Sequence, residues 1–202
     1  MGWFSKKERK PPHPNLRELN GLRWCITAWR RAAIEHWFHD GVASREELTE
    51  KLSALNWYNH VWDGADEFTD FVLKIPVGEM DPSLLLGAHW RGETASAIAW
   101  ALGLVDVIPP PSQRSDAATM ESFFPTDDRP SAIGQMALRD RALIAAELAA
   151  WKQNLVVAAA NRDRAGPTDE AAAFEFSRAY ERTRGLAWVL SDLADIEDTP
   201  MD

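Results

Sequence analysis

Apolar residues recur at alternating spacings of three and four along most of this chain, which is the period of an α-helix. The first such stripe follows a cluster of prolines and consists of Leu19, Leu22, Ile26, Trp29 and Ala33. Asn15 precedes it as a capping residue, with Glu18 in the capping-box position. The pattern predicts a helix from Asn15 to about Asp40, ended by Gly41, because glycine tolerates the left-handed conformation of a helix terminus.

Three further helices are expected in the first half of the chain. A capping box from Ser44 to Glu47 opens the second helix, whose stripe is Leu48, Leu52, Leu55 and Trp62. A short amphipathic helix follows, with its inward residues at Phe68, Phe71, Val72 and Ile75. The pair Asp81-Pro82 then opens a helix that reaches Gly103 and is expected to break near Gly87.

Two long helices are predicted in the second half. Asp140 caps the first of them, and its apolar stripe is Ile144, Leu148, Trp151, Leu155 and Ala158. Gly166-Pro167 ends it, and Thr168 is expected to cap the last helix. The inner face of that last helix is predicted at Phe176, Tyr180, Ala187 and Leu190.

The alternation of apolar and polar residues that marks a strand is absent from the sequence, and β-branched residues are scattered. We therefore expect an all-α fold, an irregular bundle of six to seven helices with no substantial sheet. Residues 15–202 are expected to form a single helical domain behind a flexible basic leader, residues 1–14. Residues 106–130 are rich in proline, so we expect a loop there that contains one short helix.

Charge limits the classes of partner. The 202 residues carry a formal net charge of −9, which disfavours nucleic acid and favours a basic protein partner. The sequence shows no signal peptide and no apolar run long enough to span a bilayer, so a cytoplasmic protein is expected. The weaker alternative is peripheral contact with an anionic membrane through Trp3, Phe4, Lys6 and Lys7 in the leader.

The segment HWRGETASAIAWALGLVDVIPPP, residues 89–111, places Arg91 and Glu93 at the start of a small-residue helix. Residues two apart on a helix face different directions, so each needs a partner elsewhere, and we expect Glu181 and Arg182 on the last helix. One interpretation is a salt-bridge network that joins two helices, and this is the favoured one. The alternative is a site for an anionic ligand held by Arg91 and Arg182.

Histidines provide a weaker candidate site. His36 and His39 lie three apart on the first helix, close enough to share a metal ion, and His60 or His89 could supply a third ligand. The favoured interpretation is that they are surface histidines near a helix end. Cys25 is the only cysteine, which rules out an intramolecular disulfide and favours a reducing compartment, and we expect no cofactor.

Ten tryptophans are unusual for a chain of this size, and several lie on the predicted inner faces. Trp24, Trp37 and Trp57 lie off those faces, so we expect them at an interface with a partner.

Three segments in order resemble a known family. They are WRGETASAIAWALGLVDVIPPP, LRDRALIAAELAAWKQNLVVAAANRDRAG and YERTRGLAWVLSDLADIEDTPMD. Together they resemble the bacterial family called domain of unknown function 4272, and the resemblance extends from Ser44 to the C-terminus. It implies a bacterial helical domain and assigns no chemistry.

Motifs for nucleophilic catalysis, phosphate binding and dinucleotide binding are absent from the sequence. We therefore expect a non-catalytic, acidic protein–protein interaction module, with an immunity-type protein that neutralises a toxin as its specific form. The alternative is an enzyme that binds a small anion or depends on a metal.

Overall fold

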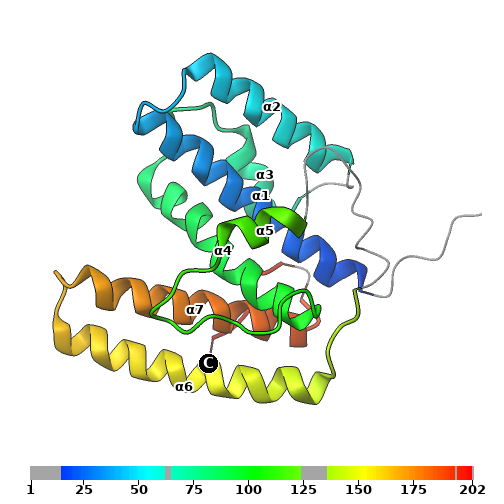
Figure 1. The fold of residues 1–202 in the computed structure, drawn as a ribbon, viewed down its shortest axis with the longest axis vertical. Helices are drawn as coiled ribbons and strands as arrows, with labels where there is room; N and C mark the ends of the chain where they lie inside the picture. Colours follow the sequence, from blue (N-terminus) through cyan, green and yellow to red (C-terminus); the bar gives the residue numbers. More distant parts are fainter. Residues whose placement is uncertain (1–14, 62–64, 124–135, 194, 202) are drawn as a thin grey trace, which may run out of the picture.

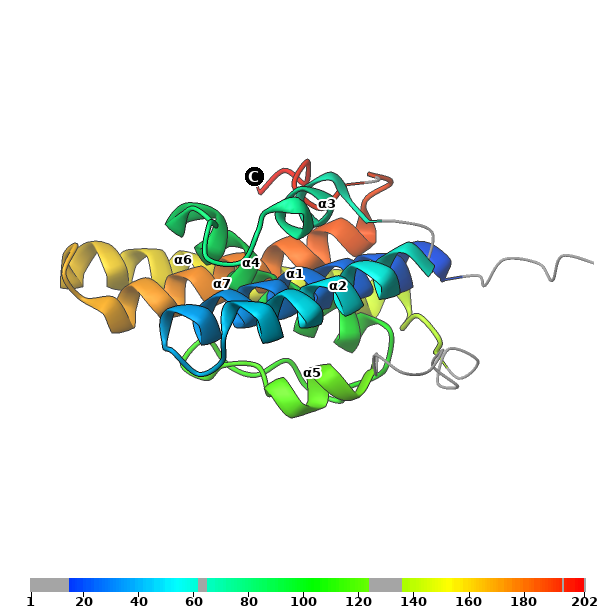
Figure 2. The same ribbon diagram turned by 90° about the horizontal axis from the view of Figure 1, so that it is seen from above.

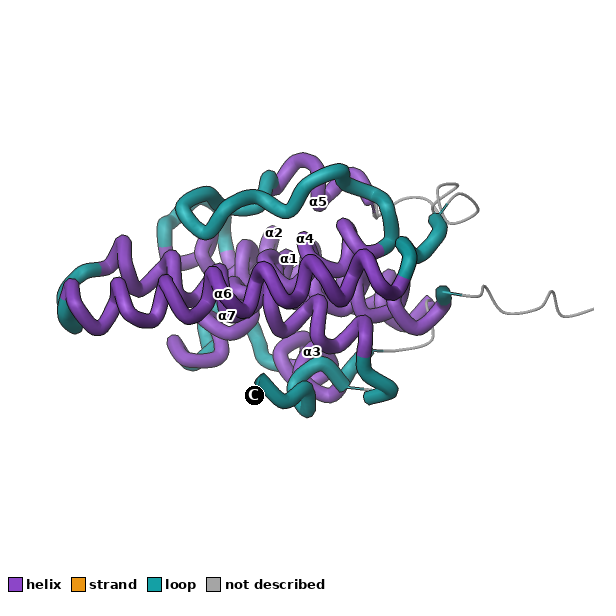
Figure 3. The backbone as a smooth tube through the Cα atoms, turned by 90° about the horizontal axis from the view of Figure 1, so that it is seen from below, coloured by secondary structure: helices purple, strands orange, loops and turns teal. Residues whose placement is uncertain are grey.

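The computed structural model describes residues 15–61, 65–123, 136–193 and 195–201, and seven helices lie within them. They are α1 (Leu16–His39), α2 (Arg45–Val61), α3 (Glu67–Lys74), α4 (Pro82–Ala101), α5 (Ala117–Phe123), α6 (Arg141–Ala165) and α7 (Glu170–Leu190). The part of the chain so described contains no strand, as Figure 3 shows. The prediction of an all-α irregular bundle of six to seven helices is confirmed.

α4 lies at the centre of the bundle. α4 packs against α1 on one side and against α7 on the other, and α6 forms an antiparallel pair with α7 at the edge of the bundle (Figure 1). α2 lies on the outer side of α1, at the opposite edge from α6. α3 and the C-terminal segment lie on one face of the bundle, whereas α5 and the loop before it lie on the other (Figure 2).

Small residues allow α4 to be buried on every side of its C-terminal half. Ala95, Ala97, Ala99 and Ala101 each have no exposed surface. Gly185 of α7 lies so close that a Cβ there would be 2.9 Å from the carbonyl oxygen of Thr94. The predicted break near Gly87 is wrong, since α4 is continuous. A glycine inside a helix costs only about 1 kcal/mol, which packing on neighbouring helices offsets.

Several helix ends follow their sequence signals. Ser44 and Glu47 exchange the two hydrogen bonds of a capping box at the start of α2. Asp81 and Asp140 cap α4 and α6 through their side chains, as expected. Gly103 takes a positive φ of 70° just beyond α4, which explains why the helix ends there.

Two predicted caps are wrong. Asn15 makes no capping hydrogen bond, because its backbone is not in the extended conformation that directs a cap side chain toward the helix. Glu18 accepts instead from Arg17 at 3.1 Å. At α7 the cap is Asp169, one residue later than the predicted Thr168, and it accepts from the backbone N–H of Ala172.

Two predicted inner faces also differ from the structure. In α3 the predicted inward residue Val72 is buried, but Phe71 is 53 % exposed and Leu73 is buried in its place. Phe176 and Tyr180 of α7 are only partly buried. The fully covered side chains of α7 include Thr183 and Leu186, because this helix lies between α4 and α6 rather than on one flat core.

Parts of the domain prediction lie outside the described residues. These are the basic leader, residues 1–14, with Trp3, Phe4, Lys6 and Lys7, and also Trp62. Within the predicted loop, residues 106–116 are non-helical and α5 corresponds to the expected short helix, while residues 124–130 are not described. A single domain over residues 15–202 stays a prediction.

Candidate functional site

Glu93 of α4 and Arg182 of α7 meet in the interior. Arg182 donates from Nη2 and Nε to the same Glu93 oxygen, Oε2, at 2.6 and 3.0 Å. The two residues are 6 % and 0 % exposed, so the pair is shielded from solvent. The structure therefore brings together two of the four residues singled out in the sequence, and they join the helices that we expected them to join.

This pair also holds the proline-rich loop that follows α4. Arg182 donates to the backbone carbonyls of Pro109, Pro110 and Gln113, at 2.5, 2.9 and 2.8 Å. Ser115 donates from its hydroxyl to Glu93 Oε2 at 2.6 Å. Prolines cannot form a regular hydrogen-bonded ladder, so Arg182 provides the partners that this loop backbone needs.

Arg91 finds different partners from those predicted. Its Nη2 lies 3.2 Å from Asp66, the N-cap of α3, and 2.7 Å from Glu197 of the C-terminal segment. The expected contact with Glu181 is not formed, because Glu181 accepts from Arg184 at 2.5 Å and from Thr94 at 2.7 Å. This second cluster ties α3, α4, α7 and the C-terminal segment together.

Both clusters are closed to ligands. Arg91 and Arg182 have no exposed surface, and the Nη2 atom of each is paired with a carboxylate of the protein. Burial raises the pKa of Glu181 above its ordinary value, although Arg184 opposes that shift. An anion held by Arg91 and Arg182 would have to displace these carboxylates, so the geometry favours the structural interpretation of the network.

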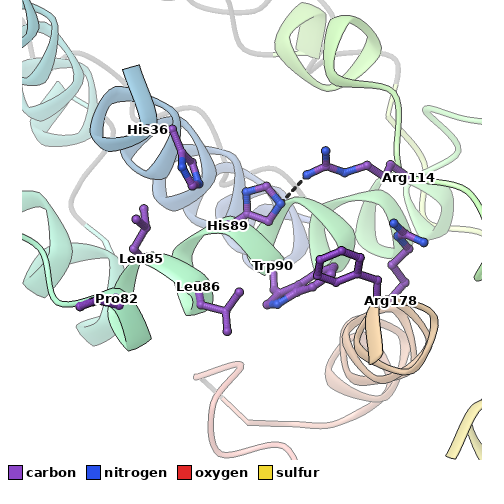
Figure 4. A pocket seen from close by; sticks show the side chains of 9 residues that line it. His36, Pro82, Leu85, Leu86, His89, Trp90, Arg114 and Arg178 are labelled. Atoms are coloured by element: carbon purple, nitrogen blue, oxygen red, sulfur yellow. Dashed lines mark hydrogen bonds between the residues drawn. The ribbon is translucent and has the colours of Figure 1, made fainter. Parts of the chain in front are cut away.

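An open cavity of about 680 Å³ lies beside the Glu93–Arg182 pair, between the end of α1, the first half of α4, the proline-rich loop and α7 (Figure 4). Its lining residues are His36, Pro82, Leu85, Leu86, His89, Trp90, Arg114, Phe174 and Arg178. We call it the basic pocket, because two arginines and two histidines line it and no carboxylate does. That composition is unexpected in a chain with a net charge of −9.

Arg114 and His89 form a defined pair at the rim of the basic pocket. The Arg114 Nη2 lies 2.5 Å from His89 Nε2. A guanidinium can only donate, so His89 accepts through Nε2 and carries its proton on Nδ1. Burial, with Arg114 and His36 nearby, lowers the pKa of His89 to about 4, so the ring is neutral at physiological pH. His89 therefore holds the Arg114 side chain without cancelling its charge.

Arg178 carries the second positive charge. Its Nη1 donates to the carbonyl of Pro111 at 3.0 Å, while its buried Nε has no hydrogen-bond partner. Figure 4 shows Arg178 and Arg114 approaching the cavity from the side opposite Leu85 and Leu86. One wall of the basic pocket is thus cationic and the other is apolar.

Aromatic rings form the floor between these walls. The rings of Trp90 and Phe174 lie 5.9 Å apart, and Leu86 is 53 % exposed beside them. Apolar walls with a few fixed polar groups are the usual composition of a small-molecule site. The lining contains no carboxylate, serine or cysteine, so its ligand contacts come from the two arginines, the aromatic rings and the histidines His36 and His89, of which His89 Nε2 is held by Arg114.

The histidine candidates separate in the structure. His36 and His89 contact each other with ring centroids 5.5 Å apart, whereas His39 lies 3.5 Å from Glu35. Among the residues described, no group of three or more His, Cys, Asp or Glu side chains is placed to hold a metal ion. His36, His39 and His60 are therefore not gathered into one three-ligand site.

The single cysteine lies in the core. Cys25 has no exposed surface, and burial raises the pKa of its thiol to about 12. The Nη1 of Arg91 lies 3.8 Å from its sulfur. A protonated, buried thiol is a poor nucleophile.

The three suspected interface tryptophans differ in exposure. Trp57 of α2 is 64 % exposed and Trp37 of α1 is 40 % exposed. Lys51 lies over the Trp37 ring, with its Nζ 5.9 Å from the centroid. Trp24 is partly buried, and its carbonyl accepts from Thr69 of α3. Trp37 and Trp57 remain available on the α1–α2 surface.

The sequence did not single out the basic pocket. Its arginines lie 64 positions apart, at Arg114 in a loop and Arg178 in α7, and only the fold brings them together. The sequence feature that pointed to it was the adjacent pair His89 and Trp90 in the middle of α4, close in sequence to Glu93.

Comparison with known proteins gives one match. A model of the family described as Domain of unknown function (DUF4272) matches residues 70–199. This segment includes α4 to α7 and all of the basic pocket except His36. No curated protein and no solved structure matches the chain.

Proposed function

Because this chain belongs to the DUF4272 family, whose description assigns no activity, we propose a function from its own geometry: it binds an organic anion with an apolar body in the basic pocket. The observation that supports this is a cavity lined by two arginines and two histidines, with no carboxylate, in an acidic protein. The proposal develops the anion-binding alternative from the sequence and moves it from Arg91 and Arg182 to Arg114 and Arg178.

The anionic head of the ligand faces the two arginines. Arg114 is held by neutral His89, and Arg178 is held by the Pro111 carbonyl. Each guanidinium keeps further N–H groups for a carboxylate, sulfonate or phosphate. The charge of the ligand is attracted here and repelled by the acidic surface elsewhere, which directs it to this cavity.

The apolar body of the ligand lies on the opposite wall and on the aromatic floor of the cavity. Leu86 and Phe174 are 53 % and 43 % exposed, and both line the cavity with Trp90. Covering these surfaces removes apolar area from water at about 25 cal/mol per Å². A cavity of about 680 Å³ fits a molecule of one or two rings or a medium-length alkyl chain.

A fluorescent apolar anion tests this directly. Anilinonaphthalene sulfonate is expected to bind the folded protein with one-to-one stoichiometry and to be displaced by phenylacetate or by alkanoates of increasing length. The chain length at which displacement is strongest reports the depth of the apolar wall. Binding that no carboxylate displaces would contradict the proposal.

Exposed aromatic residues favour a second function, the protein–protein interaction module expected from the sequence. Trp37 and Trp57 are the relevant surface residues, and an acidic surface suits a basic partner such as a toxin. A partner recovered from the source cell by the wild type and lost with Trp57→Ser would support it. A cytoplasmic location and the lack of nucleic-acid binding stay predictions.

A further inference from the structure

The outward face of α6 carries no charged side chain over five turns of helix and is apolar except at Gln153. α6 packs on α7 through Ile144, Trp151 and Ala158, the only side chains of this helix that are fully covered. On the opposite side every residue of a second stripe is exposed, at spacings of four, three, four, three and four: Ala142, Ala146, Ala149, Gln153, Val156 and Ala160. Leu143 and Val157 flank this stripe and are 47 % and 58 % exposed. We call these eight residues the outer α6 face.

An apolar helix face that is open to water is unusual. A helix that is apolar on all sides is normally covered on all sides. By length and composition α6 is also the one helix of the described chain that could cross a membrane, and only 17 % of its most apolar 18-residue stretch is buried in the bundle. In the described part of the chain, α7 is the main neighbour of α6, and Figure 3 shows α6 at the front of the bundle.

Charge limits what can cover the outer α6 face. The chain carries a net charge of −9, so two copies repel each other through most of their surfaces. The outer α6 face contains no charged residue and is the place where two acidic copies can approach without placing like charges in contact. We propose that two copies of this chain associate through their outer α6 faces, with the two helices antiparallel.

The sequence of α6 complements itself in that orientation. A two-fold axis near Trp151 places Val156 of one copy opposite Ala146 of the other, so that each large side chain meets a small one. The spacing of three and four is that of a coiled-coil seam, and alanines in such a seam let the helices approach closely. A parallel arrangement would place Val156 against Val156 and leave a gap between the alanines.

The ends of α6 do not decide the orientation. Arg141 donates from Nη2 to the Leu190 carbonyl of its own chain, and Asp163 forms an ion pair with the adjacent Arg162. The order of large and small residues along the outer α6 face therefore selects the antiparallel arrangement.

Sedimentation velocity of the full chain, from micromolar to submillimolar concentration, tests the association. The wild type is expected to show a monomer–dimer equilibrium. Ala149→Glu places two added carboxylates near the axis and is expected to weaken association by at least about tenfold, since like charges in an interface cost several kcal/mol. Ala54→Glu, an exposed alanine of α2 at the opposite edge, is the matched control and leaves the association unchanged.

Cross-linking tests the orientation. Ala149→Cys mixed with Gln153→Cys is expected to form the mixed disulfide faster than either variant forms a disulfide with itself, because antiparallel helices place position 149 opposite position 153. Cys25 is buried and does not compete. Faster self-linking of Ala149→Cys would overturn the antiparallel arrangement. A wild type that is monomeric at every concentration would overturn the proposal. The proposal would also fail if a monomeric wild type floated with phosphatidylcholine–phosphatidylglycerol vesicles and Ala149→Glu abolished that flotation.

Discussion

Arg182 of α7 donates two hydrogen bonds to a single oxygen of Glu93 on α4, at 2.6 and 3.0 Å, and uses its remaining N–H groups on the carbonyls of the proline-rich loop. That loop carries Arg114 to the rim of the basic pocket. A buried ion pair between two helices thus also determines the position of a ligand-facing cation.

The first prediction concerns this pair. Arg182→Ala leaves the Glu93 carboxylate buried without its cation, and we expect it to lower the free energy of unfolding by about 3–5 kcal/mol. Urea unfolding measures the change. Arg45→Ala removes an exposed arginine 3.7 Å from Glu79 and is the matched control, expected to cost no more than about 1 kcal/mol. Equal losses in the two variants would show that the buried pair contributes nothing special.

Replacing glycine by alanine is expected to have opposite effects on stability at two helical positions. At Gly185 an added Cβ would lie 2.9 Å from the Thr94 carbonyl oxygen, so Gly185→Ala forces α4 and α7 apart and is expected to cost about 1–3 kcal/mol. At Gly87 the nearest atom is the tip of the Phe68 ring at 3.4 Å, so Gly87→Ala is expected to gain about 0.4–1 kcal/mol. Thermal unfolding of the two variants provides the comparison, and a destabilised Gly87→Ala would contradict the packing described here.

Stability is expected to depend on the protonation of His89. Burial lowers its pKa from 6.5 to about 4, so the unfolded chain binds this proton more readily than the folded one. The contribution of His89 to stability is therefore complete above pH 6.5 and is lost as the pH falls from 6.5 toward 4. Urea midpoints measured across this range report the loss.

His89→Asn removes that part of the pH dependence, and His60→Asn is the control because His60 is exposed. An NMR titration of the folded protein in which the His89 ring protonates near pH 6.5 would contradict the environment assigned to it.

The reactivity of Cys25 provides a probe of local unfolding around α1. Its thiol is fully buried and its pKa is raised to about 12 by that burial. We expect a disulfide reagent to modify native Cys25 only as fast as the protein opens, whereas an exposed thiol from Ala54→Cys reacts at once. Rapid modification of the wild type would show that the first helix is less firmly packed than the structure indicates.

The sequence predicts the helices well because their signals are local. The stripe Ile144, Trp151 and Ala158 is buried on α7 as its spacing requires, and Asp81 and Asp140 act as caps. Thr168 fails as a cap because the adjacent Asp169 accepts the N–H of Ala172. A choice between neighbouring capping residues depends on the backbone angles of the entering chain, which a sequence pattern does not contain.

The candidate site is harder to predict because its contacts are tertiary. Glu93 and Arg182 could be paired in advance, since each is a charge on a predicted core helix. The partners of Arg91 could not, because Asp66 and Glu197 lie outside regular helix and their positions depend on how α3 and the C-terminal segment dock. The same reason hides Arg114 and Arg178, which meet only after the loop is fixed by Arg182.

In the proposed function, Arg178 and Arg114 make the basic pocket selective for an apolar anion. The most direct test is a paired titration with anilinonaphthalene sulfonate and with its uncharged analogue, phenylnaphthylamine, on the wild type, Arg178→Gln and Arg114→Gln. Arg164→Gln, an exposed arginine at the end of α6, is the matched control.

We predict that each pocket substitution weakens binding of the sulfonate by about tenfold or more, since a hydrogen bond to a charged group contributes about 1.5–3 kcal/mol. Binding of the neutral analogue is expected to stay the same in all variants, which also shows that the pocket remains folded. Sulfonate binding that is unchanged in Arg178→Gln and Arg114→Gln, or lost equally in Arg164→Gln, would contradict the account.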